Sequence, residues 1–319
     1  MNTWSDISTD KMPKPGDRAL IIVESSFQLL CAYEVISRYR LNYVLVLRMT
    51  GVGRNDEQLL QTASALGVSC VPIVARVHRL AADMLWAGPK LLPLLMRRYQ
   101  HLFLGSYFSR FLRMLRRGVQ ARHTWILDDG LATLEAQADM AKSGRIQDLA
   151  TCLELPELPG QTILHHKLES IVGLNPIEYT DRSLFIGQPF VELDMMRARD
   201  YEDILAFSRE TSKSRLTYIP HRAESAERIA GLQRAFDMDI HYPPTCIELD
   251  LVRNGEVPRQ TFSVMSTAAF TIARMFPGTT VTIFPAPLEG VDPQQRETVD
   301  YARTISNMRI NELVGAGAP

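Results

Sequence analysis

The sequence predicts an α/β protein built from two successive halves, each with a parallel sheet. Short continuous apolar runs alternate with segments of helical spacing, and this alternation restarts near residue 181. Continuous apolar runs are typical of strands buried on both faces, as in parallel sheets covered by crossover helices. The length of 319 residues accommodates two such halves. Hydrophobic residues form 46% of the chain and charged residues 22%, which excludes disordered, collagen-like and coiled-coil classes.

The first half shows a βαβαβ beginning. An apolar run at 19–23 is followed by helical spacing over 27–36, for which Ser25 or Ser26 is a natural N-cap. A strand at 43–47, a helix at 55–66 and a strand at 68–74 come next. This order predicts a right-handed, doubly wound parallel sheet. The pattern continues with strands at 101–104 and 123–127 and helices at 107–117 and 131–141.

The second half repeats the pattern after the Pro- and Gly-containing stretch 155–175, which we interpret as a connection. Its expected strands are 184–187, 216–219, 247–249, 262–265 and 281–284, and its expected helices are 201–209, 226–236 and 294–313. We therefore predict a flexible N-terminal tail over 1–17, a first Rossmann-like domain over 18–180 and a second over 181–319. The chain lacks a GxxxxGK[ST] loop and a GxGxxG after its first strand, which argues against a nucleotide-driven motor and a nicotinamide dehydrogenase.

The net charge and the cysteine positions exclude further classes of protein. The 35 basic and 36 acidic residues give a net charge of -1, which argues against a nucleic-acid partner. The four cysteines are far apart and form no CxxC pair, so we expect neither a zinc site nor a disulfide framework. Residues 1–17 are polar, unlike a signal peptide, and no apolar run approaches the ~18 residues that span a bilayer. We expect a cytoplasmic protein.

An acidic pair, Asp128-Asp129, follows the apolar run 125–127 and precedes Gly130. Two adjacent carboxylates after a buried strand suit a general base, since repulsion and partial burial raise one pKa. Gly130 permits a tight turn and the close approach of a substrate. A surface Asp-Gly turn and a pair of metal ligands are the alternatives.

Two further clusters follow strands of the second half. His221 comes after Pro220 and precedes Arg222, where it can carry a proton or bind a phosphate oxygen. Ser266 and Thr267 open a helix, where hydroxyls and backbone N–H groups form an anion site. The alternatives are a solvated loop histidine and ordinary N-capping by Ser266.

The order of these clusters resembles that of the bacterial sialyltransferase and polysialyltransferase group, glycosyltransferase family 52 or the related α-2,8-polysialyltransferase family. That group carries a D/E-D/E-G motif, an HP motif and an S-S/T motif in this order. Supporting matches are residues 26–30 after the first strand and 185–189 at the start of the second half. One departure is Arg222, where the family more often has proline, and it bears on the identity of the sugar donor.

The resemblance implies a GT-B fold, in which two Rossmann-like domains face a central cleft and a final helix crosses back to the first. It implies transfer of sialic acid from CMP-sialic acid to a glycan acceptor, with inversion and with no cofactor or metal. Asp128 would be the general base, Asp129 would orient it, and His221 would stabilise or protonate the departing phosphate. Ser266 and Thr267 would bind that phosphate. The remaining donor-side positions are Gly187, Gln188, Pro220 and Glu248, and the acceptor-side positions are Ser26, Gln28, Gly105, Ser106 and Gly130.

Glu248 has a more specific expected role, because a carboxylate at the end of a short strand can accept hydrogen bonds from the cytosine amino group. A partly exposed edge-strand carboxylate is the alternative. For the whole protein, the alternatives are a transferase that uses another CMP-activated nonulosonate or Kdo, a UDP-sugar GT-B enzyme such as a hydrolysing epimerase, and a non-catalytic glycan- or membrane-binding relative. The sequence leaves the acceptor, the linkage and the oligomeric state open.

The near-neutral net charge of the chain includes one strongly basic stretch. No acidic residue occurs between Met84 and Leu127, and the stretch 90–122 holds eight basic residues interleaved with apolar ones. Basic amphipathic segments are typical of faces that bind membranes or polyanions, so peripheral contact with an anionic membrane is one expectation. The alternative is a solvated face whose arginines pair with acids elsewhere in the chain.

Overall fold

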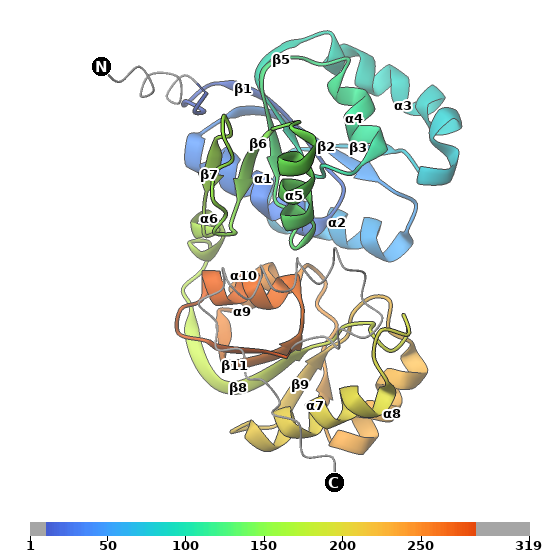
Figure 1. Ribbon diagram of the computed structural model, residues 1–319, viewed down its shortest axis with the longest axis vertical. Coiled ribbons are helices and arrows are strands. Elements are labelled where there is room, and N and C mark those ends of the chain that lie inside the picture. Colours follow the sequence, from blue (N-terminus) through green and yellow to red (C-terminus); the bar gives the residue numbers. More distant parts are fainter. Residues whose placement is uncertain (1–10, 285–319) are drawn as a thin grey trace. The chain divides into compact units, whose positions relative to one another are not determined.

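The computed structural model describes residues 11–284, and the structural statements below concern these residues. The chain divides into two compact units (Figure 1). The first unit holds the chain up to Gly173 together with Pro244–Leu249, and the second holds Leu174–Pro243 and the chain from Asp250. The sequence analysis placed the boundary later, between residues 180 and 181. That position lies inside a strand, β8 (Glu178–Ile186), whose first half is too polar to reveal itself as a buried run.

The first unit is a seven-stranded sheet with the order β3-β2-β1-β4-β5-β6-β7. All neighbouring strands pair in parallel. The progression along the chain reverses between β1 and β4, which is where open α/β sheets bind ligands. The strands are β1 (Arg18–Val23), β2 (Asn42–Met49), β3 (Val71–Val74), β4 (Arg98–Leu104), β5 (Gln120–Leu127), β6 (Asp148–Thr151) and β7 (Ile163–His165).

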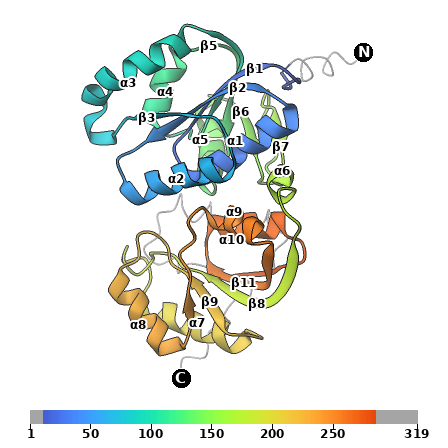
Figure 2. The same ribbon diagram turned by 180° about the vertical axis from the view of Figure 1, so that it is seen from behind.

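Helices cover both faces of this sheet, with α1 and α2 on one face and α5 on the other (Figures 1 and 2). α1 begins where Ser25 accepts a hydrogen bond from the Gln28 backbone N–H, and it ends at Arg40, whose left-handed backbone stops the helix. The helices of this unit are α1 (Ser26–Tyr39), α2 (Gly53–Ala65), the short η1 (Val77–Arg79), α3 (Leu80–Leu95), α4 (Arg110–Arg116), α5 (Ala132–Ser143) and α6 (Glu169–Val172).

Part of the predicted N-terminal tail is attached to this sheet. Lys11 forms an ion pair with Asp148 at 3.1 Å. The Asp17 carboxylate lies 3.0 Å from Nε2 of the buried His101, whose Nδ1 accepts a hydrogen bond from the Trp125 indole. Because Nδ1 accepts, Nε2 is the protonated nitrogen that donates to Asp17. Residues 11–17 are therefore held by polar contacts that their own sequence does not reveal.

The second unit is a five-stranded parallel sheet with the order β10-β9-β8-β11-β12. Its core centres on Phe185, which stacks on Tyr218 with ring centroids 5.5 Å apart and meets Tyr201 edge-on. Besides β8, its strands are β9 (Leu216–Ile219), β10 (Asp239–Ile240), β11 (Glu256–Val264) and β12 (Thr280–Phe284). Its helices are α7 (Ala198–Thr211), α8 (Ala226–Phe236) and α10 (Thr267–Met275), while α9 (Ile247–Asn254) begins within the residues assigned to the first unit.

The sequence-based assignment lacks α3 and several short elements, and it takes one helix for a strand. The stretch 155–175, interpreted as a connection, contains β7 and α6, each too short to show a period. The predicted strand 247–249 is wrong, because these residues form the first turn of α9, with Ile247, Leu251 and Val252 buried at helical spacing. The predicted final helix 294–313 lies outside the described residues. Within 11–284, no helix is long and apolar enough to cross a membrane.

Candidate functional site

Three adjacent strands of the first unit carry the predicted acceptor-side residues at their carboxyl ends. Ser26 and Gln28 follow β1, Gly105 and Ser106 follow β4, and the segment 128–130 follows β5. Because the sheet order is β1-β4-β5, these segments meet at one edge. The edge includes the point where the strand progression reverses, as the ligand site of an open α/β sheet does.

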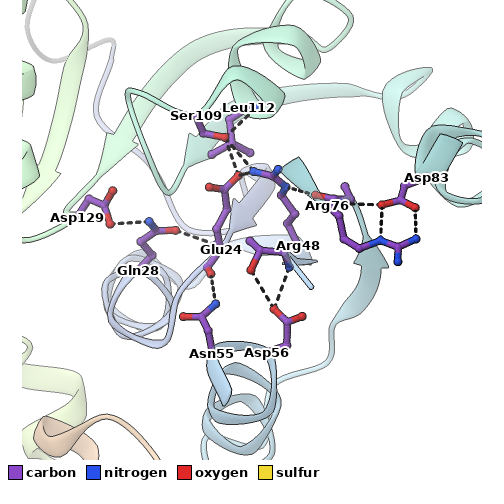
Figure 3. Close-up of polar contacts among 12 residues, drawn as sticks. Glu24, Gln28, Arg48, Asn55, Asp56, Arg76, Asp83, Ser109, Leu112 and Asp129 are labelled. Carbon is purple, nitrogen blue, oxygen red and sulfur yellow. Dashed lines mark hydrogen bonds and ion pairs between the residues drawn. The ribbon is translucent and has the colours of Figure 1, made fainter. Parts of the chain in front are cut away.

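Asp129 is the candidate reactive carboxylate at this edge. Its Oδ1 accepts a hydrogen bond from Gln28 Nε2 at 2.6 Å (Figure 3). The Ser106 side chain also forms a hydrogen bond with the Asp129 carboxylate. Gln28 in turn accepts the Glu24 backbone N–H at 2.8 Å. Burial raises the pKa of Asp129, with a smaller push from the charges of Asp128 and Glu24, while the bonds from Gln28 and Ser106 oppose the rise. A carboxyl group with a raised pKa and a fixed orientation suits a general base.

Asp128, the predicted general base, is instead fully buried. Its two oxygens accept five hydrogen bonds, from the Gly130 N–H, Thr133 Oγ1, Thr151 Oγ1, the Cys152 N–H and Cys152 Sγ. Every lone-pair direction is thus occupied, and no acceptor hydroxyl or metal ion can reach the carboxylate. This geometry does not favour Asp128 as the base, and Asp128 instead ties β5, β6 and α5 together.

Two glycines let this edge close up. A Cβ atom on Gly105 would overlap the Gln28 side chain, so glycine allows Gln28 to lie across the end of β4 and reach Asp129. Gly130 has a φ of 70°, the left-handed region that favours glycine, and this turn aims its N–H at Asp128. Ser26 is less informative, because its hydroxyl is buried and has no hydrogen-bond partner among the described residues.

A buried ion pair that sequence analysis missed supports the same edge. Arg48 Nη1 lies 2.6 Å from Glu24 Oε1, and Ser109 Oγ donates to the same oxygen at 2.7 Å (Figure 3). Arg48 also donates from Nε to the Ala75 carbonyl at 2.8 Å and lies 4.7 Å above the Phe111 ring. The signal was present, because an arginine inside the apolar run of β2 requires a partner. The next loop is fixed similarly, with Asp56 accepting the backbone N–H groups of Thr50 and Gly51.

The second unit gathers the predicted donor-side residues in the same way. Gly187 and Gln188 follow β8, Pro220 and His221 follow β9, and Ser266 and Thr267 follow β11. The sheet order β9-β8-β11 places these ends side by side at the carboxyl edge. The three motif segments of this unit are therefore neighbours, although more than forty residues separate some of them in sequence.

His221 is held as a neutral hydrogen-bond donor. Its Nδ1 accepts the Ala223 backbone N–H at 3.2 Å, so the ring proton sits on Nε2. Burial lowers the pKa of His221, and the neighbouring Arg222 charge lowers it further. A neutral imidazole with Nε2–H outward can donate to a phosphate oxygen without first being protonated.

A buried acid positions this histidine. Glu224 accepts the His221 backbone N–H at 2.6 Å and the Tyr218 hydroxyl through its other oxygen. The hydroxyls of Tyr218 and Tyr201 lie 2.9 Å apart, and Tyr201 accepts the Gln188 N–H. Burial raises the pKa of Glu224 to about 7. A Cβ atom on Gly187 would overlap both Glu224 and Tyr218, which explains the glycine.

Ser266 stands at the start of α10 but does not cap it. It is the N-cap residue, is nearly fully buried and makes no side-chain capping hydrogen bond. The preceding Met265 has a φ of 43°, a left-handed conformation that is uncommon for a non-glycine residue. The ordinary N-capping alternative, a hydrogen bond from the Ser266 hydroxyl to the helix, is therefore not what the structure shows.

Glu248 does not fit its predicted role. It lies in the first turn of α9 and not at a strand end, is almost fully buried, and belongs with the residues of the first unit. Its charge raises the pKa of the buried Cys31 thiol, after larger effects of burial, Asp128 and Cys152. Elsewhere, all four cysteines are free. Across residues 11–284, no group of three or more His, Cys, Asp or Glu side chains could hold a metal ion.

Comparison with solved structures agrees with the two-unit architecture. A protein from Listeria monocytogenes assigned as a UDP-N-acetylglucosamine 2-epimerase aligns with a TM-score of 0.52 at 11% identity, covering 85% of this chain and 79% of the other. The UDP-GlcNAc 2-epimerase from Methanocaldococcus jannaschii aligns with a TM-score of 0.50 at 9% identity, covering 92% and 94%. The chain has a GT-B fold. The predicted fold class is confirmed.

The E. coli heptosyltransferase WaaC also aligns, with a TM-score of 0.48 at 13% identity, covering 86% of this chain and 90% of that one. No protein-family profile and no curated protein matches the sequence. Identities this low show the fold alone. The resemblance to sialyltransferases therefore stays a prediction.

The contrasting surroundings of the two adjacent aspartates predict losses of stability of different size. Asp128→Asn replaces one accepting oxygen with a donor that faces other donors, so it should lower the free energy of unfolding by roughly 3 kcal/mol. Asp129→Asn keeps an acceptor for Gln28 and removes a poorly solvated charge, so it should cost less than about 1 kcal/mol. Urea unfolding of both variants measures the difference. Equal losses for both would contradict the anchoring role of Asp128.

Glu224 predicts a pH-dependent stability. Its folded pKa of about 7 lies above the ordinary 4.5, so in this window the folded state holds a proton that the unfolded chain releases. The contribution of Glu224 is therefore complete below this window and falls as the pH rises, by at most about 1.4 kcal/mol per pH unit.

The matched variant is Glu224→Gln, which mimics the protonated acid and does not titrate. Between about pH 5 and about pH 8, the stability of the wild type should fall by roughly 2 kcal/mol relative to this variant. Denaturant unfolding at both pH values tests this. A constant difference would show that the Glu224 pKa is not raised.

Proposed function

We propose that the protein transfers sialic acid from CMP-sialic acid to a hydroxyl group of a bacterial surface glycan in the cytoplasm, with inversion and without a metal ion. The observation that carries the proposal is the state of Asp129. This carboxylate is oriented by Gln28 and Ser106 and has a raised pKa, at the carboxyl edge of the first sheet. The resemblance to sialyltransferases supports the donor assignment, and the GT-B fold is compatible with it.

In the proposed acceptor half of the reaction, Asp129 takes over the role predicted for Asp128. The acceptor hydroxyl transfers its proton to the Asp129 carboxylate as its oxygen bonds to the anomeric carbon. The hydrogen bond from Gln28 Nε2 occupies Oδ1, so Oδ2 is the oxygen that we assign to the proton. Asp128 acts only through position, by fixing the turn that carries its neighbour.

In the proposed donor half, the bond between the anomeric carbon and the CMP phosphate oxygen breaks, and CMP leaves with the electron pair. The anomeric carbon of a sialyl donor is tertiary and bears a carboxylate, so its transition state resembles an oxocarbenium ion. Stabilising the leaving group therefore matters most. We assign this to His221 Nε2–H, the hydroxyls of Ser266 and Thr267, and the N-terminus of α10. None of these groups needs a cation.

Neighbouring residues complete the donor side of the proposal. Gly187 and Gln188 would lie against the nucleotide, and Pro220 restricts the loop that carries His221. Glu248 is left out because it is buried and belongs with the residues of the first unit. Transfer from another CMP-activated nonulosonate or from Kdo would use the same residues, whereas a UDP-sugar enzyme would have to accommodate a diphosphate leaving group at this edge.

The donor is tested by a screen of CMP-, UDP- and GDP-sugars in the presence of EDTA. We expect nucleotide release from CMP-sialic acid alone, because the proposed leaving-group contacts are hydrogen bonds and not metal bonds. Release measured by liquid chromatography is the readout. Turnover of a UDP-sugar with no binding of any CMP-sugar would contradict the donor assignment. No turnover of any donor, with CMP still bound, would favour a non-catalytic relative.

The general base is tested by Asp129→Asn. Loss of the proton acceptor should lower kcat by roughly 100- to 10,000-fold while CMP affinity stays nearly unchanged. The wild-type rate should rise with pH through a midpoint above the ordinary range of an aspartate, since the pKa of Asp129 is raised and the base must be ionised. Full activity of Asp129→Asn would exclude this assignment.

The role of His221 is tested by comparing two substitutions. His221→Gln keeps a side-chain N–H that can reach toward the Nε2 position, whereas His221→Ala removes the donor. We expect His221→Ala to lose both transfer rate and CMP affinity, and His221→Gln to retain part of both. Because His221 acts as a neutral donor, the rate should show no loss as the pH rises through the ordinary histidine range. Equal activity of the Ala variant and the wild type would rule out the phosphate contact.

A further inference from the structure

The outward side of α3 is apolar. Leu85, Trp86, Leu92 and Met96 are 77%, 85%, 59% and 73% exposed. Together with the exposed Pro89 and Pro93, they recur at helical spacing and form one continuous stripe along α3 and the residue after it. A surface helix of a globular protein normally turns charged residues outward. Large exposed apolar patches mark sites of interaction.

The inner side of α3 already accounts for its folding. Ala87, Leu91 and Leu94 are buried, and the buried Asp83 binds Arg76 through both carboxylate oxygens at 2.7 and 3.0 Å. The outward stripe therefore contributes nothing to the core of the unit. Exposing a tryptophan and several aliphatic side chains costs hydration free energy that a partner would recover.

Cations flank this stripe. The eight basic residues of the stretch 90–122 are all exposed, and seven of them form no ion pair among the described residues; these seven are Lys90, Arg97, Arg98, Arg110, Arg113, Arg116 and Arg117. The last acid before the stretch, Asp83, is paired with Arg76. The expectation that these arginines pair with acids elsewhere is thus not met for the seven.

The two helices that carry these residues belong to one surface region. α3 and α4 lie side by side in both views (Figures 1 and 2). The segments that follow them converge, because Arg98 pairs with Gln120 across β4 and β5 and donates to its side chain at 3.3 Å. α4 adds the partly exposed Met114, and the loop before it adds Phe108.

We propose that α3 and α4 form a docking surface for an anionic lipid bilayer. Trp86, Leu85, Leu92 and Met96 would enter the interface between headgroups and acyl chains, and the unpaired cations would lie against the lipid phosphates. Charge complementarity favours an anionic bilayer as the partner, because an apolar stripe bordered by positive charges matches acyl chains beneath anionic headgroups. Tryptophan is also the side chain that favours the bilayer interface. The proposal does not rest on the proposed function.

The charge contribution is tested by co-sedimentation of the full chain with vesicles, in the absence of any sugar nucleotide. We expect binding to phosphatidylcholine vesicles that contain phosphatidylglycerol, weaker binding to phosphatidylcholine alone, and a steep loss with salt. The triple variant Arg110→Gln, Arg113→Gln, Arg117→Gln should weaken binding by roughly 100-fold.

The matched control removes three exposed cations from the second unit, through Arg199→Gln, Lys213→Gln and Arg234→Gln. We expect it to bind nearly as the wild type does. Equal weakening by both triple variants would overturn the location of the surface. Binding that ignores lipid charge and salt would overturn its electrostatic basis.

Insertion is tested with the fluorescence of Trp86. The chain has three tryptophans, Trp4, Trp86 and Trp125. Substituting Trp4→Phe leaves two, of which Trp86 is exposed and Trp125 is fully buried, so a change caused by lipid is assigned to Trp86. Its emission should shift to shorter wavelength on anionic vesicles, and brominated lipids should quench it. Trp86→Ser with Leu85→Ser should weaken binding without changing the melting temperature, because both side chains are exposed. An unshifted spectrum, or self-association that these substitutions abolish, would overturn the proposal.

Discussion

A buried carboxylate, Asp128, fixes the geometry on which the candidate site of the first unit depends. Its two oxygens collect hydrogen bonds from the turn after β5, from the start of α5 and from the end of β6. A buried charge is stable only when its lone pairs are satisfied in this way. Because Asp128 uses all of its bonds inward, it fixes the turn that carries the half-buried Asp129. Adjacent residues of one chemical type thus take opposite roles through their surroundings alone.

In the second unit, too, a buried carboxylate fixes the geometry of a loop that carries a candidate functional residue. Glu224 is buried, accepts the His221 backbone N–H and is held by the Tyr218 hydroxyl. The histidine ring therefore leaves the loop in a set direction, with Nδ1 engaged by the Ala223 N–H and Nε2 free to donate. In both units a buried acid restrains a short loop after a parallel strand, and the functional candidate is the neighbour that it positions. Gly105 and Gly187 serve these arrangements by leaving room for Gln28 and Glu224.

Much of the architecture could be predicted from the sequence, because buried parallel strands appear as continuous apolar runs. The runs at β1, β2, β5 and β9 are clear, and the three motif segments of the second unit lie at the ends of the neighbouring strands β9, β8 and β11. Short elements such as β7 were not predicted, because three residues are too few to show a hydrophobic period. Residues 247–249 were mistaken for a strand, since a single turn of helix and a short strand look alike.

The sequence indicated which residues lie at the ends of the strands, but it did not indicate how each side chain is bonded there. Which aspartate of the pair is buried depends on Thr133, Thr151 and Cys152. Thr151 ends β6 and Cys152 follows it, and this strand was not predicted from the sequence. The pairing of Arg48 with Glu24 and of Glu224 with Tyr218 likewise depends on contacts between elements. Sequence spacing can indicate that a polar residue in an apolar run needs a partner, but only the fold identifies that partner.

The central claim is that Asp129, and not Asp128, is the ionisable group presented at this edge. Carboxyl carbon NMR titration of the aspartates tests it directly, with Asp129→Asn used to assign the resonance. The account predicts a resonance that titrates above the ordinary range of an aspartate and disappears in this variant while the protein stays folded. A resonance for Asp129 that titrates at or below the ordinary range would contradict the account.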